Sequence, residues 1–216
     1  MKKAIILLSG GLDSAVTLYQ AKKEGYKTFC LLFDYGQKHK KELKSAVKIA
    51  KLSKSPFKII KMNLPWKGSA LLDSAISIPH NALENIGKNA LPSTYVPARN
   101  TIFISFALSY AETIKAQAIF IGANALDFSG YPDCRPDYFK SWNNLIKVLG
   151  IKNITVKTPL INKTKKEIIA LGRKLNVPLK YTWSCYAGGL KPCGKCDSCK
   201  LRAKGFSETG LVDPAN

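Results

Sequence analysis

Short, continuous apolar runs alternate along this chain with longer segments whose apolar residues recur every three or four positions. The runs, each typical of a buried strand, span residues 4–8, 27–34, 57–62, 118–122 and 154–157. The segments with helical spacing span residues 15–23, 38–52, 101–115, 136–149 and 163–175. The alternation therefore predicts five strands, most of them followed by a helix.

This order of elements predicts the α/β class. Strands joined by right-handed helical crossovers form a parallel sheet that is covered on both faces. We expect a Rossmann-like, five-stranded parallel sheet with helices on both faces. Ligands of such sheets bind outside the carboxyl ends of the strands. Polar segments at 9–14, 34–37 and 122–127 each follow a predicted strand, so we expect them to meet at one edge.

Residues 63–97 break the alternation. The stretch contains four prolines and scattered polar residues, with little periodicity. We expect a long functional loop or a mobile lid there.

The strongest motif is the sequence SGGLDS at residues 9–14, directly behind the first apolar run. Two glycines allow a tight turn, and Asp13 and Ser14 are suited to the start of a helix. Turn amides and the positive end of a helix dipole then converge on one anion site, suited to a phosphate or pyrophosphate. The motif lacks the lysine of a Walker A loop and differs from the dinucleotide GxGxxG fingerprint. Asp13 would repel a pyrophosphate, so it either caps the helix or helps to hold Mg²⁺; the alternative for the whole motif is an ordinary strand–helix turn.

Four of the six cysteines are bunched near the carboxyl end, at positions 185, 193, 196 and 199. Four thiolates are the number that a closed tetrahedral zinc site needs, and such a site has a structural role. An iron–sulfur cluster also takes four cysteines, whereas a redox pair needs two. We expect Cys30 to be a core residue and Cys134 to pack or to contact a substrate.

Charge and hydropathy narrow the class of protein further. The chain carries 34 basic and 14 acidic residues, for a net charge of +20. RNA or nucleotide partners would explain this excess, but the lysines are scattered and form no arginine-rich or aromatic-interleaved tract. No apolar stretch is long enough for an export signal or a membrane span, which predicts a cytoplasmic protein.

In these segments the sequence resembles a known family. The motif SGGLDS looks like the pyrophosphate loop of the N-type ATP pyrophosphatases, the PP-loop enzymes with an adenine nucleotide alpha hydrolase-like fold. Four further segments, residues 33–39, 95–100, 127–136 and 183–202, are similar in order to the 7-cyano-7-deazaguanine synthase family. The similarity covers nearly the whole chain. Its departures are small: Phe128 stands where tyrosine is also common, and Ala98 where glycine is frequent.

The resemblance implies an ATP-dependent ligase. Enzymes of this family convert 7-carboxy-7-deazaguanine and ammonia, through an adenylate, into 7-cyano-7-deazaguanine, the nitrile precursor of the queuosine and archaeosine bases of tRNA. The resemblance implies ATP, Mg²⁺ and a structural Zn²⁺ as cofactors. It also implies a homodimer without a membrane partner or an obligatory nucleic-acid partner. We expect a catalytic ATP-binding part at residues 1–180, and a zinc-binding segment at 181–216 packed on it.

Roles for individual residues follow from the matched motifs. ATP is expected to contact Leu8, Ser9, Gly10, Gly11, Leu12, Asp13 and Ser14, and the metal Cys185, Cys193, Cys196 and Cys199. The expected catalytic residues are Asp13, Ser14, Arg99 and Asp127. The expected substrate contacts are Arg99, Asn100, Asp127, Tyr131, Asp133 and Arg135. Arg99 suits a phosphate or carboxylate because its fork pairs with both oxygens, whereas the alternative for Asp133 and Arg135 is a local salt bridge.

The sequence alone does not decide the source of the ammonia, and it leaves two alternative functions. A built-in glutaminase needs a nucleophilic cysteine with a histidine, and the chain has only His39 and His80, so we expect free ammonia or a separate donor. One alternative function is another tRNA-modifying ATP pyrophosphatase. The other is a zinc-knuckle binder of nucleic acid or a regulator that retains a nucleotide fold.

Overall fold

A five-stranded parallel sheet forms the centre of the molecule in a computed structural model, which describes residues 1–86, 91–126 and 130–215. The strands are β1 (Lys3–Leu7), β2 (Lys27–Asp34), β3 (Phe57–Lys61), β4 (Ala118–Ile121) and β5 (Thr155–Lys157). Their order is β3-β2-β1-β4-β5, and every neighbouring pair is parallel. The predicted fold class and strand number are confirmed.

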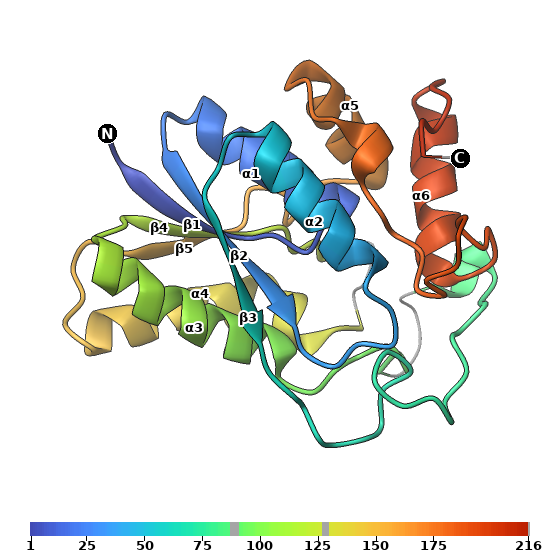
Figure 1. Cartoon of the computed structure of the whole chain (residues 1–216), viewed down its shortest axis with the longest axis horizontal. Helices are drawn as coiled ribbons and strands as arrows, with labels where there is room; N and C mark the ends of the chain where they lie inside the picture. Colours follow the sequence, from blue (N-terminus) through green and yellow to red (C-terminus); the bar gives the residue numbers. More distant parts are fainter. Residues whose placement is uncertain (87–90, 127–129, 216) are drawn as a thin grey trace.

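Helices cover both faces of this sheet (Figure 1). They are α1 (Leu12–Lys23), α2 (Lys41–Leu52), α3 (Arg99–Ile114), α4 (Pro136–Val148), α5 (Lys165–Lys174) and α6 (Asp197–Glu208). One core contains buried residues of α1, α2, α5 and α6, and the other contains buried residues of α3 and α4. The described connections contain three short 3₁₀ helices, Leu83–Asn85, Pro132–Cys134 and Leu179–Tyr181. The first of them lies in the loop predicted at residues 63–97.

The central strand shows why the apolar runs are continuous. Ala4 and Ile6 of β1 belong to one core, whereas Ile5 and Leu7 belong to the other, and all four side chains are buried. A strand between two helical layers exposes neither face, so both sets of alternate positions are apolar.

Helix α6 was not predicted, because its apolar positions are few and its cysteine was assigned to a metal. The helix instead packs closely on α5. A Cβ atom added at Gly205 would lie 2.5 Å from Cγ of Lys165 and 2.9 Å from Cδ1 of Ile169. The lack of a side chain at this position allows the two helices to approach.

The sheet order sends the connections after β1 and β4 to opposite faces of the sheet. The connection after β1 runs to α1 on one face, whereas the chain after β4 runs toward α4 on the other, so the two diverge beside each other. Gly122 directly follows β4 and lies against the first turn of α1: an added Cβ there would lie 2.8 Å from the amide nitrogen of Ser14. The segments that follow β1 and β4 are therefore in direct contact at this edge of the sheet.

A buried ion pair fastens the carboxyl-terminal segment. The guanidinium of Arg202 donates to both carboxylate oxygens of Asp213, at 2.6 and 2.9 Å, and to the hydroxyl of Thr182 at 2.8 Å. Upstream, the amide of Trp183 donates to the carbonyl of Gly10 at 2.9 Å. This segment is thereby joined to the loop after β1; the boundary at residue 180 stays a prediction. No described helix is both long and apolar enough to cross a membrane.

We predict that Gly10→Ala lowers the free energy of unfolding by at least about 2 kcal/mol. Gly10 has φ +92°, and an added Cβ would lie 2.2 Å from the carbonyl oxygen of Glu42 and 2.6 Å from the amide nitrogen of Ala46. Urea unfolding measures the loss. Gly25→Ala is the matched control, because Gly25 has φ +83° but no atom of the described residues within 4 Å of an added Cβ. We expect about 1 kcal/mol there, and equal losses would contradict the steric argument.

We also predict that Asp213→Asn costs about 3 kcal/mol of unfolding free energy, because it leaves the buried guanidinium of Arg202 without a counter-charge. Thermal and urea unfolding measure this. The control is Glu208→Gln: Glu208 pairs with Lys204 at 3.8 Å on the surface, so its loss should stay under about 0.5 kcal/mol. A loss this small for Asp213→Asn would show that the buried pair contributes nothing.

Candidate functional site

A cavity of about 250 Å³ opens at the carboxyl ends of the strands. At one end it is bounded by the loop after β1, including Ser9, Gly11 and Asp13. At the other end it is bounded by the start of α3, including Arg99, and by Tyr186 of the carboxyl-terminal segment. The predicted meeting of polar segments at this edge is seen for the parts after β1 and β2, and for Gly122–Asn124 after β4.

The loop after β1 is held by its own serines. The hydroxyls of Ser9 and Ser14 are 3.1 Å apart; the first accepts from the amide of Gly11 and the second from the amide of Gly10, both at 3.2 Å. The N-cap residue of α1 is Gly11 and no described side chain caps the helix, so the capping alternative for Asp13 is wrong and its role as a Mg²⁺ ligand stays a prediction. Backbone amides at a helix start together with two hydroxyl groups suit an anion with several oxygens.

Lys165 places a positive charge beside the loop after β1, whose own sequence contains no lysine. Its Nζ atom lies 2.8 and 2.9 Å from the two carboxylate oxygens of Asp13, and both residues line the cavity. Lys165 is the first residue of α5, whose start is fixed by a capping box between Thr164 and Glu167. The sequence analysis missed Lys165, because 152 residues separate it from Asp13 and only the fold brings them together.

Arg99 is the principal cation at the other end. Its Nη1 atom donates to the hydroxyl of Tyr35 at 3.3 Å, and its guanidinium lies 5.9 Å from the centre of that ring. The hydroxyls of Tyr131 and Thr94 are 2.5 Å apart, and both residues line the cavity. An arginine in the wall of a cavity lined by aromatic hydroxyls can hold a carboxylate or a phosphate.

The predicted substrate residues occupy different places. Arg99, Asn100 and Tyr131 line the cavity; Asp133 and Arg135 are not among the described residues that line it. Asp133 is buried and accepts from the amide of Asn100 at 3.2 Å, which holds the start of α3. Arg135 is exposed, and no ion pair joins these two described residues. Asp127 lies outside the described residues.

Glu42 is a second functional candidate that the sequence analysis did not identify. It lies in the first turn of α2 and lines the cavity. Burial raises the pKa of its carboxyl to about 7, although the charge of Arg99 opposes the shift. One signal was present in the sequence: Glu42 precedes Ala46 by one helical turn and so belongs to the buried face of α2.

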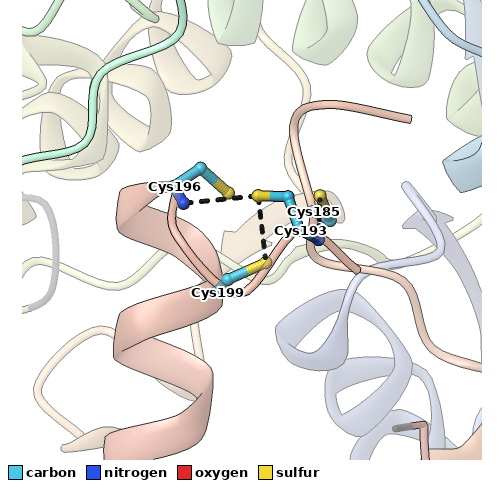
Figure 2. Close-up of side chains that lie close together, drawn as sticks. All are labelled: Cys185, Cys193, Cys196 and Cys199. Atoms are coloured by element: carbon cyan, nitrogen blue, oxygen red, sulfur yellow. Dashed lines mark hydrogen bonds between the residues drawn. The ribbon is translucent and has the colours of Figure 1, made fainter. Parts of the chain in front are cut away.

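The four bunched cysteines converge on one point (Figure 2). Their sulfur atoms all lie within 4.8 Å of one another, and those of Cys193 and Cys199 are 4.0 Å apart. Four sulfurs around one zinc ion, at the usual Zn–S distance of about 2.3 Å, stand about 3.8 Å apart, so this arrangement fits a tetrahedral metal site. The amides of Cys193 and Cys196 donate to the sulfurs of Cys185 and Cys193, at 3.3 and 3.4 Å.

The other two cysteines are unsuited to nucleophilic chemistry. Burial raises the pKa of the Cys30 thiol and of the Cys134 thiol to about 12, so both stay protonated at neutral pH. Cys30 is completely buried in a core, as expected. Cys134 lines the cavity beside Asn100, so it can contact a bound molecule.

Comparison with known proteins places the chain in a family. The family described as "Queuosine biosynthesis protein QueC" matches residues 3–210. A "7-cyano-7-deazaguanine synthase" of Picrophilus torridus is 54% identical over 99% of this chain and 90% of its own length, and one of Trichodesmium erythraeum is 53% identical over 98% and 99%. Among solved structures, an NMN synthetase from Francisella tularensis superposes with a TM-score of 0.54 over 98% of this chain and 78% of its own, at 18% identity, which shows a shared fold. With the loop after β1, the cavity and the cysteine cluster all inside the matched region, the chain belongs to the QueC family.

Proposed function

We propose that this protein is a ligase that converts 7-carboxy-7-deazaguanine, ammonia and ATP into 7-cyano-7-deazaguanine. The observation that carries the proposal is the family match over residues 3–210, which includes both ends of one cavity. An anion-binding loop at one end and Arg99 at the other suit a reaction between a nucleotide and an acid.

The chemical difficulty is that a carboxylate is a poor electrophile. An oxygen of the substrate carboxylate attacks the α-phosphorus of ATP, the bond to the β-phosphate breaks, and pyrophosphate leaves. The acyl carbon then carries AMP as a good leaving group, and ammonia displaces it to give the amide. A second activation, at the amide oxygen, allows the loss of that oxygen and gives the nitrile.

The loop end of the cavity stabilises charge on the departing pyrophosphate. Amides of Gly10 and Gly11 exchange their hydroxyl partners for phosphate oxygens, and the Ser9 and Ser14 hydroxyls donate to the same group. Lys165 moves its ammonium from Asp13 to the phosphates. Bound Mg²⁺ would spread the growing negative charge. Asp13, released from Lys165, would hold it, together with Asp127.

The other end binds the acid. Arg99 pairs with the substrate carboxylate before activation, and Asn100 and Tyr131 contact the deazaguanine. We propose that Asp133 acts indirectly, by positioning Arg99. It binds the backbone at the start of α3, and Arg99 is the first residue of that helix. Arg135 is proposed to contact the substrate only at the outer edge, because its side chain is exposed.

A mass-spectrometric assay tests this function: the purified protein with ATP, Mg²⁺, ammonium and the acid should form the nitrile. Lys165→Met should raise the KM for ATP about 10- to 100-fold, which corresponds to the loss of a charge-assisted hydrogen bond. Lys166→Met is the matched control, because Lys166 is the next residue of α5 and is exposed. Absence of acid-dependent ATP turnover in the wild-type protein would refute the function. Equal KM values in the two variants would remove Lys165 from phosphate binding.

We propose that the cysteine site holds a structural zinc ion. Zinc prefers four thiolates in a closed tetrahedron, and such a site leaves no position for water. Elemental analysis should find about one zinc per chain. Cys193→Ser should lose most of it and melt at a lower temperature, whereas Cys30→Ala should keep it. Iron with sulfide in place of zinc would identify a cluster instead.

We propose further that the enzyme acts in the cytoplasm as a homodimer, without an obligatory nucleic-acid partner. None of the six cysteines forms a disulfide, and a site made of four of their thiolates needs a reducing compartment, which supports this location. The dimer rests on the resemblance to the family. The scattered lysines support small substrates rather than a nucleic-acid groove.

A further inference from the structure

The proposed reaction gives no role to one half-buried carboxyl group that lines the cavity, that of Glu42. Glu42 lies beside the phosphate-binding loop: its backbone carbonyl is in close contact with Gly10, and a Cβ atom added at Gly11 would lie 3.9 Å from its Oε1. Its other electrostatic neighbours are Arg99 and Tyr186. The carboxyl therefore lies between the phosphate end and the substrate end, where the acyl group has to meet its nucleophile.

The groups that face Glu42 come from three elements. Arg99 from α3 favours the ionised carboxylate. Tyr35 after β2 and Tyr186 from the carboxyl-terminal segment carry phenol groups whose pKa values are raised by burial, so both are neutral. Once a substrate carboxylate pairs with Arg99, the negative charge of the ionised Glu42 is available to bind another cation. Neutral phenol oxygens beside it can accept additional hydrogen bonds from that cation.

The nucleophile of the proposed reaction has the complementary need. Ammonia in neutral water is mostly ammonium, which has no lone pair for attack. A carboxylate that binds ammonium and then takes a proton from it would produce the reactive form at the acyl carbon. A base is most effective when its pKa is near the working pH, and burial raises that of Glu42 to about 7.

We infer that Glu42 is the ammonium-binding site of this enzyme and the base that deprotonates ammonium, an inference that rests on the proposed function. An N–H bond of ammonium breaks and its proton goes to the Glu42 carboxylate. The freed lone pair forms the C–N bond as the C–O bond to AMP breaks, with the electron pair of that bond leaving on AMP. The excess proton on nitrogen leaves with the AMP phosphate, and Glu42 then releases its own proton to solvent.

The test uses Glu42→Gln, which keeps the size of the side chain. With ammonium, amide formation at pH 7 should fall about 100-fold or more. Exchange of labelled pyrophosphate into ATP, driven by the acid without ammonia, should change less than about threefold, because adenylation does not need this base. Hydroxylamine is largely neutral at pH 7, so hydroxamate formation by the variant should stay within a few-fold of wild type.

The pH profile separates a base from a merely structural residue. The wild-type rate at subsaturating ammonium should rise as Glu42 ionises and then level off. In Glu42→Gln it should follow free ammonia and keep rising about tenfold per pH unit while ammonium is the main form. Glu112→Gln, an exposed change on α3, is the control and should match wild type in every assay.

The possible results of these experiments lead to different conclusions about Glu42 and about the proposed function. Unchanged ammonium-dependent rates in Glu42→Gln would overturn the inference. So would an equal loss with hydroxylamine and ammonium, or a loss of pyrophosphate exchange, since both point to a damaged cavity. A wild-type protein that lacks acid-dependent exchange would instead refute the proposed function, before Glu42 is considered.

Discussion

Close contact between backbones around the loop after β1 is the constraint on which the rest of the structure depends. Gly10 touches α2, and Gly122 at the end of β4 touches the first turn of α1. Both contacts exclude a side chain, so the loop amides are held at one edge of the sheet. The position of these amides and that of Glu42 beside them both follow from this packing.

The cavity balances charges that a reaction can redistribute. Asp13 is paired with Lys165, and the charge of Arg99 acts on Glu42, which lies beside the loop after β1. In the proposed reaction, the negative charges of the nucleotide and of the acid would pair with Lys165 and Arg99, which would free Asp13 and Glu42 to bind cations. Although the net charge of the chain is +20, these charged groups of the cavity interact as local pairs of opposite charge.

The carboxyl-terminal segment, although far from most of the other lining residues in sequence, forms part of the cavity wall. Its Trp183 and Tyr186 line the cavity, and the buried pair of Arg202 and Asp213 holds the segment in place. Asp197, next to the cysteines, accepts from the backbone amide and side-chain amide of Asn81, at 2.8 and 2.7 Å. The cysteine cluster is therefore connected to the long loop after β3, whose residues also reach the cavity wall.

The sequence by itself determined the sheet, the helices α1 to α5 and the two local motifs. Continuous apolar runs and helical spacing are local properties, and so are the spacing of the cysteines and the glycines of the loop. The tertiary structure alone decided that Lys165 meets Asp13, that Glu42 faces Arg99, and that Asp133 supports α3 instead of lining the cavity. These relations join residues of different elements, and α6 forms on a weak apolar pattern because it packs against α5. Long-range packing and electrostatics leave no periodic signal in a single sequence, since they depend on how the folded elements approach one another.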